Sequence, residues 1–205
     1  MRIATTIYDN LAKRNVPAEL IIGVDAGIIE KVGRQWKRER IQKALQGKVS
    51  EHFHWDWGQK ASYINGLLAY DFFALECQGT IEGLMLTESV CHRAEIPPDE
   101  GKPILYIEFI EAAPRNTVVL NDISFYRDIG TRLIEGAVNF SMEQGFEGRV
   151  GLLTLSQAEQ FYRKMGFEKV RFDSKERLYY YERTAKTSKQ LLDKGNKYDI
   201  SNEQR

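Results

Sequence analysis

The sequence has few cysteines and no excess charge of either sign. Among 205 residues there are 2 cysteines, too few for a disulfide framework, so reduced thiols in a cytoplasmic protein are the simplest interpretation. Lys plus Arg equals Asp plus Glu at 29 each, which gives no general attraction to nucleic acid or to an anionic membrane. Two of the three histidines, His52 and His54, are thin support for a metal site, and we expect none.

Long apolar runs are missing as well. No stretch approaches the ~20 apolar residues that cross a bilayer, and the first residues lack the apolar core of a secretory signal. We therefore expect a cytoplasmic protein without a membrane partner. The sequence does contain 42% hydrophobic and 11% aromatic residues, which is enough for a sizeable core and argues against wholesale disorder.

Residues 1–50 are predicted to form a helical N-terminal segment. Ile29, Val32 and Trp36 recur at helical spacing, and no clear strand pattern accompanies them. A basic run from Arg34 to Lys43 lies in the same segment. We interpret this run as a solvated helix face or as a contact surface for an acidic partner or RNA.

Residues 51–184 carry the patterns of a folded core. The patterns predict strands at 70–78, 81–90 and 104–113, a helix at 129–144, a strand at 150–155, a short helix after it, and strands at 167–173 and 177–184. This order predicts an α/β fold in which helices cover the faces of a sheet. The remaining residues, 185–205, are polar and are expected to be a disordered tail.

The short helix carries the most informative motif. Ser156 and Glu159 predict a capping box at its start, and Gly166 predicts the left-handed residue that ends it. Tyr162 to Phe167 reads Y-x-x-x-G-F. This pattern resembles the GNAT N-acetyltransferase superfamily, in which the tyrosine sits beside the sulfur of acyl-coenzyme A.

Three upstream pieces stand in register with the same family, and the resemblance covers roughly residues 70–184. Residues 106–114 resemble its central strand and the following proline, 126–134 resemble its pyrophosphate loop and helix start, and 148–152 resemble its fifth strand. The resemblance implies a GNAT-like mixed, mostly antiparallel sheet with a splayed central strand pair and helices on both faces. Acyl-CoA is then the donor, and its pantetheine lies in the gap between the splayed strands.

The resemblance also implies the residues that hold the cofactor. A helix N-terminus attracts phosphate through its free amides and its dipole, and the predicted helix opens at Ile129. The diphosphate is therefore expected beside four residues at that helix start, and the pantetheine beside two backbone positions of the central strand. These are Arg127, Ile129, Gly130 and Thr131 for the diphosphate, and Ile110 and Ala112 for the pantetheine.

The loop departs from the family pattern R/Q-x-x-G-x-G/A at two positions. Gly130 fits the last position, whereas Phe125 and Asp128 replace the Arg/Gln and the first Gly. A carboxylate ~5 Å from a phosphate opposes binding by about 1 kcal/mol in water-like surroundings, so Asp128 is expected to weaken CoA binding. Its alternative role is a plain helix N-cap.

Two side chains are candidates for proton transfer. Tyr162 is the candidate general acid for the departing thiolate, or else a packing tyrosine. Glu108 lies on one face of its strand with Tyr106 and is the candidate base, with a raised pKa, or else a salt-bridged or edge residue. Glu111 on the other face is a weaker candidate, and a water relay without an assignable base stays open.

Trp55 and Trp57 precede the first hairpin of the core, where the family places its acceptor-site helices. They either line an acceptor pocket or pack the N-terminal segment on the sheet. The acceptor is an amine of a small molecule or a protein, and a homodimer is left open. The neutral charge argues against aminoacyl-tRNA and other nucleic acids.

Two functions follow from these residues. The first is an N-acetyltransferase that moves an acetyl or other acyl group from acyl-CoA, with acetyl-CoA as donor and no metal, to a primary amine by direct attack. The alternative is a catalytically degenerate GNAT fold that binds acyl-CoA or a protein partner without turnover. Asp128 motivates this alternative.

Overall fold

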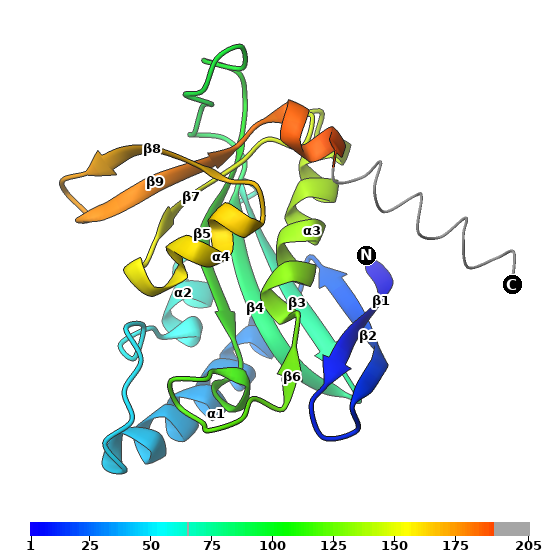
Figure 1. Cartoon of the computed structure of the whole chain (residues 1–205), viewed down its shortest axis with the longest axis vertical. Helices are drawn as coiled ribbons and strands as arrows, with labels where there is room; N and C mark the ends of the chain where they lie inside the picture. Colours follow the sequence, from blue (N-terminus) through cyan, green and yellow to red (C-terminus); the bar gives the residue numbers. More distant parts are fainter. Residues whose placement is uncertain (65, 191–205) are drawn as a thin grey trace, which may run out of the picture. The chain divides into compact units, whose positions relative to one another are not determined.

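The computed structural model describes residues 1–64 and 66–190 of the chain. In these residues nine strands follow the hydrogen-bonded order β6-β1-β2-β3-β4-β5-β7-β9-β8 in one mixed sheet. The chain divides into two compact units, of which the first holds residues 1–87 and 109–134. The strand β5 (Leu105–Ala112) and the helix α3 (Ile129–Glu143) contribute residues to both units (Figure 1).

The first unit begins with a β-hairpin. Strand β1 (Arg2–Asp9) pairs antiparallel with β2 (Arg14–Ile22), and β2 pairs with β3 (Tyr70–Cys77). In β2 the buried side chains alternate with exposed ones: Val16, Ala18, Leu20 and Ile22 are buried. The prediction of helix over residues 1–50 is therefore wrong for these two strands, because a period of two, not 3.6, places one face of the hairpin in the core.

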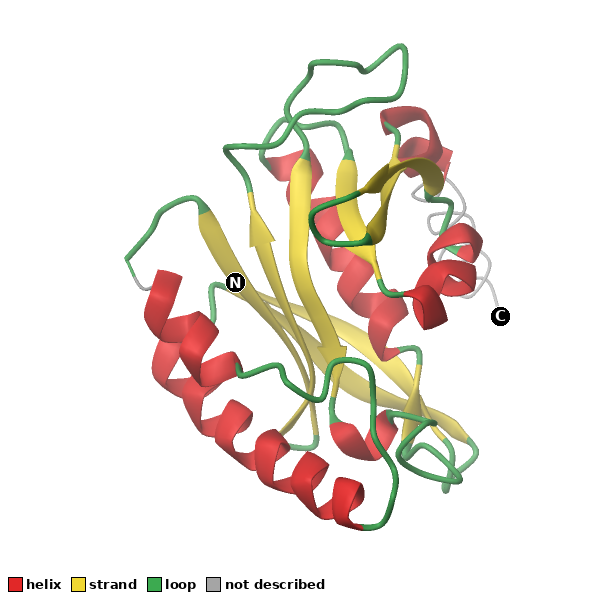
Figure 2. Cartoon of the chain, turned by 90° about the vertical axis from the view of Figure 1, so that its left-hand side faces the viewer, coloured by secondary structure: helices red, strands yellow, loops and turns green. Residues whose placement is uncertain are grey.

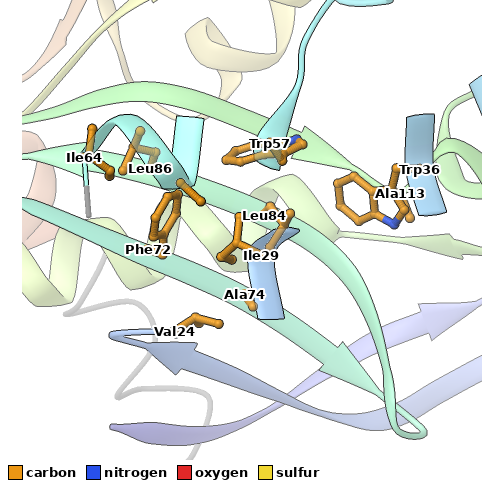
Figure 3. Close-up of a cluster of buried hydrophobic side chains, with 11 residues drawn as sticks. Val24, Ile29, Trp36, Trp57, Ile64, Phe72, Ala74, Leu84, Leu86 and Ala113 are labelled. Carbon is orange, nitrogen blue, oxygen red and sulfur yellow. The ribbon is translucent and has the colours of Figure 1, made fainter. Parts of the chain in front are cut away.

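Helix α1 (Ala26–Leu45) follows the hairpin and α2 (Trp57–Ile64) comes next. Asp25 caps α1 by accepting a hydrogen bond from the Gly27 amide at 2.8 Å. Figure 2 shows the two helices beside the strands of this unit. Their buried side chains form a core with those of β3 and β4 (Thr80–Glu88), shown in Figure 3: Val24, Ile29, Trp36, Trp57, Ala61, Ile64, Phe72, Ala74, Leu84, Leu86 and Ala113.

The first turn of α3 packs on the opposite face of β4. Leu84 belongs to the core under α1 and α2, so its neighbour Gly83 faces the other way. A Cβ at Gly83 would lie 2.6 Å from Ile129 Cγ2 and 2.9 Å from Leu133 Cδ1. Glycine at this position therefore lets the start of α3 approach the strand closely. Between β5 and α3 lie the short helix η1 (Pro114–Asn116) and strand β6 (Tyr126–Arg127).

The second unit contains the end of α3 and three further strands. Strand β7 (Val150–Thr154) pairs parallel with the start of β5, from Leu105↔Val150 to Ile107↔Leu152. It pairs antiparallel with β9 (Leu178–Arg183), which also pairs with β8 (Glu168–Asp173). The short helix η2 (Ser156–Ala158) and helix α4 (Glu159–Lys164) connect β7 to β8.

The predicted elements of residues 70–184 are confirmed, and their ends agree within two residues. The predicted capping box is wrong. The short helix has no side-chain cap, and the Glu159 carboxylate instead accepts from the Tyr181 hydroxyl at 2.7 Å and pairs with Lys169 at 3.0 Å. Gly166 adopts the expected left-handed conformation with φ of 78°.

The start of the predicted disordered tail is ordered. Residues 185–190 are helical, and the buried Ser188 hydroxyl donates to the Gly148 carbonyl at 2.7 Å. Polarity suggested disorder, but a buried hydroxyl with a partner holds this segment in place. The other tail residues, 191–205, lie outside the described residues. Within residues 1–64 and 66–190, no helix is both long and apolar enough to cross a membrane.

Candidate functional site

The loop that opens α3 turns through a residue in the left-handed conformation. Asp128 is exposed and adopts the left-handed conformation with φ of 70°, which glycine favours. Its carbonyl accepts from the Arg132 amide at 2.9 Å, so Asp128 occupies the position just before the helix. Asp128 therefore adopts a glycine-like backbone conformation at the position where the family pattern has glycine, and the role of this loop in CoA binding stays a prediction.

The Arg127 guanidinium and the backbone amides of the first turn of α3 lie at the same helix start. Arg127 is exposed, and its guanidinium carbon lies 4.4 Å from the centre of the Tyr8 ring. Ile129 is buried, while Gly130 and Thr131 are half-buried and supply amide groups of the first turn. A guanidinium beside a helix N-terminus is able to bind an anion, and the exposed Asp128 carboxylate opposes that binding.

Ile110 and Ala112, the positions expected to bond the pantetheine, lie on β5 in the first unit. Both side chains are half-buried. Just beyond them, the Ala113 amide donates to the Glu82 carbonyl at 2.8 Å, which fixes the end of β5 on β4. The role of Ile110 and Ala112 stays a prediction.

The expectation that Trp57 lines an acceptor pocket is wrong. Its side chain is 0% exposed and belongs to the core cluster of Figure 3. Its indole N–H donates to Glu111 Oε2 at 2.6 Å. A ring enclosed on all sides has no surface left for a substrate, so the packing alternative holds for Trp57.

Trp55 remains a candidate for acceptor contact. It is half-buried, and its ring meets the edge of Phe109 at 5.0 Å between centroids. Lys60 Nζ lies 3.1 Å from the centre of the same Phe109 ring. Trp55 and Phe109, with the Lys60 ammonium over the Phe109 ring, therefore form an aromatic cluster beside the middle of β5 in the first unit.

Glu111 is a structural residue and not a base. Its carboxylate is fully buried and forms an ion pair with Arg40 Nη1 at 2.6 Å. The second carboxylate oxygen accepts from Trp57, and His52 Nε2 lies 3.2 Å from Oε1. Arg40 also donates to the Trp55 carbonyl. The interpretation of the basic run as a solvated face or contact surface is therefore wrong for Arg40, which is 1% exposed.

Tyr162 is buried in the second unit. Its ring contacts Phe161 at 5.1 Å and Phe167 at 5.6 Å between centroids. In the described part of the chain, no hydrogen-bond partner is found for its hydroxyl. Burial raises the pKa of Tyr162, so the phenol keeps its proton at physiological pH. The ring packs against these two aromatic residues, and the role of Tyr162 as a general acid stays a prediction.

Glu108 is half-buried and follows Ile107, the last residue of β5 that pairs with β7. Burial and the nearby Glu108 carboxylate together raise the pKa of Tyr106. The His92 imidazole stacks on the Tyr106 ring at 3.8 Å, and burial lowers the pKa of His92. A neutral imidazole therefore lies beside Tyr106, as the Glu108 carboxylate does. The contact between His92 and Tyr106 was not predicted, because His92 lies in a loop, where no sequence period indicates its neighbours.

No group of three or more His, Cys, Asp or Glu side chains able to hold a metal ion is found in residues 1–64 and 66–190. Cys77 is buried and Cys91 is exposed, and both are free thiols.

Comparisons with known proteins identify the fold. No protein-family model matches the chain, and no curated protein matches its sequence. Solved structures do match. An acetyltransferase of the GNAT family from Listeria monocytogenes 4b F2365 aligns with a TM-score of 0.53 and 13% identity, over 87% of this chain and 99% of that one.

Two further solved structures carry a coenzyme ligand. The PaiA N-acetyltransferase from Thermoplasma acidophilum in complex with coenzyme A aligns with a TM-score of 0.53 and 15% identity, over 80% of this chain and 98% of that one. A protein described as a predicted acetyltransferase, with acetyl-CoA, from Clostridium acetobutylicum aligns with a TM-score of 0.50 and 13% identity, over 75% of this chain and 91% of that one. At these identities the likeness establishes the fold.

Proposed function

Because the chain has the GNAT acetyltransferase fold, we propose that it is an acyl-CoA-dependent N-acyltransferase. It moves an acetyl or other acyl group from acyl-CoA to a primary amine by direct attack. The observation that carries the proposal is the loop before α3, where Asp128, at the place of the motif's glycine, adopts a left-handed conformation that glycine favours, and Arg127 stands at the helix start.

The loop is assigned to the diphosphate of the cofactor. The first-turn amides of Ile129, Gly130 and Thr131 and the Arg127 guanidinium supply the attraction. Asp128 subtracts from it, by about 1 kcal/mol if water screens the pair. The backbone around Ile110 and Ala112 bonds the pantetheine, as the family resemblance implies.

In the reaction, the amine lone pair attacks the thioester carbon and forms a tetrahedral oxyanion. A backbone N–H of β5 stabilises that oxygen. The C–S bond then breaks, the thiolate leaves, and the amine gives up a proton. Glu108 takes this proton directly or through water.

Tyr162 assists the leaving thiolate. A free thiol has a pKa of about 8.5, below that of a buried phenol, but a thiolate in a water-poor site also gains proton affinity. The Tyr162 hydroxyl therefore donates a hydrogen bond as negative charge grows on sulfur, and its proton follows when the thiolate is desolvated. Among the described residues no other acceptor is found for the buried Tyr162 hydroxyl, which supports this assignment.

The acceptor is a primary amine of a small molecule or a protein. Trp55 and Phe109 offer it an aromatic surface in the first unit. Trp57 has no part in acceptor contact, since it is enclosed in the core.

Calorimetry with acetyl-CoA and CoA, followed by a thiol-release assay with pooled amines, tests the proposal. Binding together with amine-dependent release of CoA thiol is the expected result. Binding without release for any acceptor class supports the degenerate, acyl-CoA-binding alternative. Absence of binding to either nucleotide contradicts both functions.

A further inference from the structure

The N-terminal hairpin holds the loop that opens α3. Strand β6 pairs antiparallel with β1 through Tyr8↔Arg127 and Asp9↔Tyr126, and Figure 1 shows the two strands side by side. This pairing makes the segment just before α3 part of the sheet. The main-chain hydrogen bonds of this pairing restrain the backbone of that segment.

Asn10, directly after β1, adds three hydrogen bonds to the same segment. Its backbone N–H donates to the Phe125 carbonyl at 2.9 Å. Its side-chain Nδ2 donates to the Ser124 carbonyl at 2.7 Å and to Ser124 Oγ at 3.0 Å. Asn10 is 9% exposed, so these bonds are shielded from competing water.

Tyr8 places the cation of the loop. The Arg127 guanidinium lies over its ring at 4.4 Å, within the range of a cation–π contact. An exposed arginine otherwise samples many rotamers, and ordering it on a ligand costs free energy. Contact with the Tyr8 ring restricts the Arg127 rotamers before the ligand binds, so less side-chain entropy is lost on binding.

A second anchor holds the loop from the other side. Glu82 on β4 is 1% exposed and accepts from Arg115 Nε at 2.9 Å and from Asn116 Nδ2 at 2.7 Å. Asn116 Oδ1 in turn accepts from the backbone N–H of Tyr126 at 2.9 Å. The strand that precedes the helix start is thus tied to β4 by a buried carboxylate and to β1 by Asn10.

We propose that Tyr8 and Asn10 are positioning residues for the diphosphate of acyl-CoA: Asn10 fixes the backbone before α3 and Tyr8 fixes Arg127. The inference rests on the proposed function, because it concerns the same anion. Tyr8 and Asn10 thus help the loop to bind the diphosphate, a function that the family motif assigns to glycine and to Arg or Gln. Where Phe125 and Asp128 replace those residues, preorganisation by the hairpin supplies affinity that the loop lacks.

The test measures the Kd of CoA by calorimetry for folded variants. Loss of the Asn10 side-chain bonds in Asn10→Ala is expected to raise the Kd about threefold to tenfold, the range that corresponds to one or two hydrogen bonds. Tyr8→Ala is expected to raise it about threefold, whereas Tyr8→Phe keeps the ring and retains the wild-type Kd. Asn139→Ala is the matched control, because Asn139 is an exposed asparagine of α3 away from the loop.

Amide hydrogen exchange provides a second readout. In Asn10→Ala without ligand, the amides of residues 124–127 are expected to exchange faster than in wild type, while those of β3 do not change. A purely structural role would lower the melting temperature without this local change and without a shift in Kd.

The outcomes separate the two proposals. If wild type binds CoA and both Asn10→Ala and Tyr8→Ala bind it equally well, the positioning roles are overturned and the proposed function stands. If Asn10→Ala does not fold, the pair Tyr8→Ala and Tyr8→Phe decides alone, and equal Kd values for these two overturn the inference. If wild type itself does not bind CoA, the proposed function falls and the inference falls with it.

Discussion

Three buried carboxylates, two in the first compact unit and one in the second, are compensated in different ways. In the first unit, Glu82 and Glu111 are each about 1% exposed at the side chain, and each meets a guanidinium, that of Arg115 or that of Arg40. Both ion pairs join segments far apart in the sequence. One holds α1 and α2 on the sheet, and the other holds the loop before α3.

In the second unit, Glu182 is 0% exposed and is held by other groups. It accepts from the backbone N–H of Glu95 at 2.7 Å and of Ile96 at 3.3 Å, and the Tyr180 hydroxyl lies 3.3 Å away. Burial raises the pKa of Glu182, as it raises that of Tyr162 in the same unit. Glu82 and Glu111 of the first unit thus keep paired charge, whereas burial favours the protonated form of Glu182. Asp99 of the second unit is a paired carboxylate as well, 2.9 Å from Lys102 Nζ and 3.6 Å from Arg149 Nη1.

Removal of a guanidinium from the first unit should have the largest effect on stability. Arg40→Ala leaves the Glu111 charge buried and unpaired, so we expect a loss of about 3–5 kcal/mol in the free energy of unfolding. Glu182→Gln, which keeps one acceptor for the Glu95 amide, is expected to cost about 1 kcal/mol. Urea unfolding followed by tryptophan fluorescence measures both.

Arg34→Ala is the control for this pair of variants. Arg34 lies on the same helix, is 65% exposed at the side chain and pairs with Glu30 at 3.6 Å, so its loss should change stability by about 0.5 kcal/mol or less. Equal losses for Arg40→Ala and Glu182→Gln would remove the distinction between a carboxylate held by paired charge and one held by neutral donors.

Loss of the Tyr162 hydroxyl should have the largest effect on catalysis. Tyr162→Phe keeps the ring against Phe161 and Phe167 and removes the donor, so acyl transfer is expected to slow by ~10²-fold with an unchanged Kd for CoA. Because burial raises the pKa of Tyr162, its titration should not reduce the wild-type rate below about pH 10. Stopped-flow or steady-state thiol release measures both quantities.

The matched control in the second unit is Tyr179→Phe, because Tyr179 is 38% exposed and carries no proposed role. An unchanged rate in Tyr162→Phe would exclude Tyr162 from the mechanism. The distinction between a unit that positions and a unit that transfers protons would then lose its main support.

Removal of the Asp128 charge should have the smallest effect, and a favourable one. Asp128→Asn keeps a side chain that tolerates the left-handed conformation, and Asp128→Gly removes its backbone cost. Both are expected to tighten CoA binding about fivefold, which corresponds to the ~1 kcal/mol of lost repulsion. Calorimetry with CoA measures the change.

Asp122→Asn serves as the comparison, since Asp122 is 96% exposed at the side chain in the same connecting segment and pairs with Lys48. It should leave the Kd for CoA unchanged. Weaker binding in both Asp128 variants would mean that the carboxylate is needed at the helix start, so that the first unit positions its ligand with a negative group as well.

The sequence predicted the core of the fold because its signals are local. Strands such as β3 and β4 and the helix α3 show their periods within a few residues, and Gly145 and Gly166 end helices with positive φ. The assignment of the loop before α3 to the diphosphate has the same basis, since its motif is contiguous. Tyr162 was proposed from a contiguous motif too.

The N-terminal hairpin was missed although its signal was present. Val16, Ala18, Leu20 and Ile22 alternate with more exposed residues, as a half-buried strand requires. Pro17 interrupts the pattern and removes a backbone donor, and the helical spacing from Ile29 to Trp36 dominates the segment. The alternation of apolar and polar residues at every second position over these nine residues predicts strand β2, and a strand at this place requires a partner such as β1.

The amino-acid sequence alone determined the order of the longer elements from β3 to β9, without the two-residue strand β6, because each depends on neighbours along the chain. Only the tertiary structure decided which charged residues are buried. Arg40 meets Glu111 across 71 residues, and Asn10 meets Ser124 across 114. Such partners are set by packing, since the cost of burying a charge or a polar group is recovered only when the fold brings its counterpart within bonding distance.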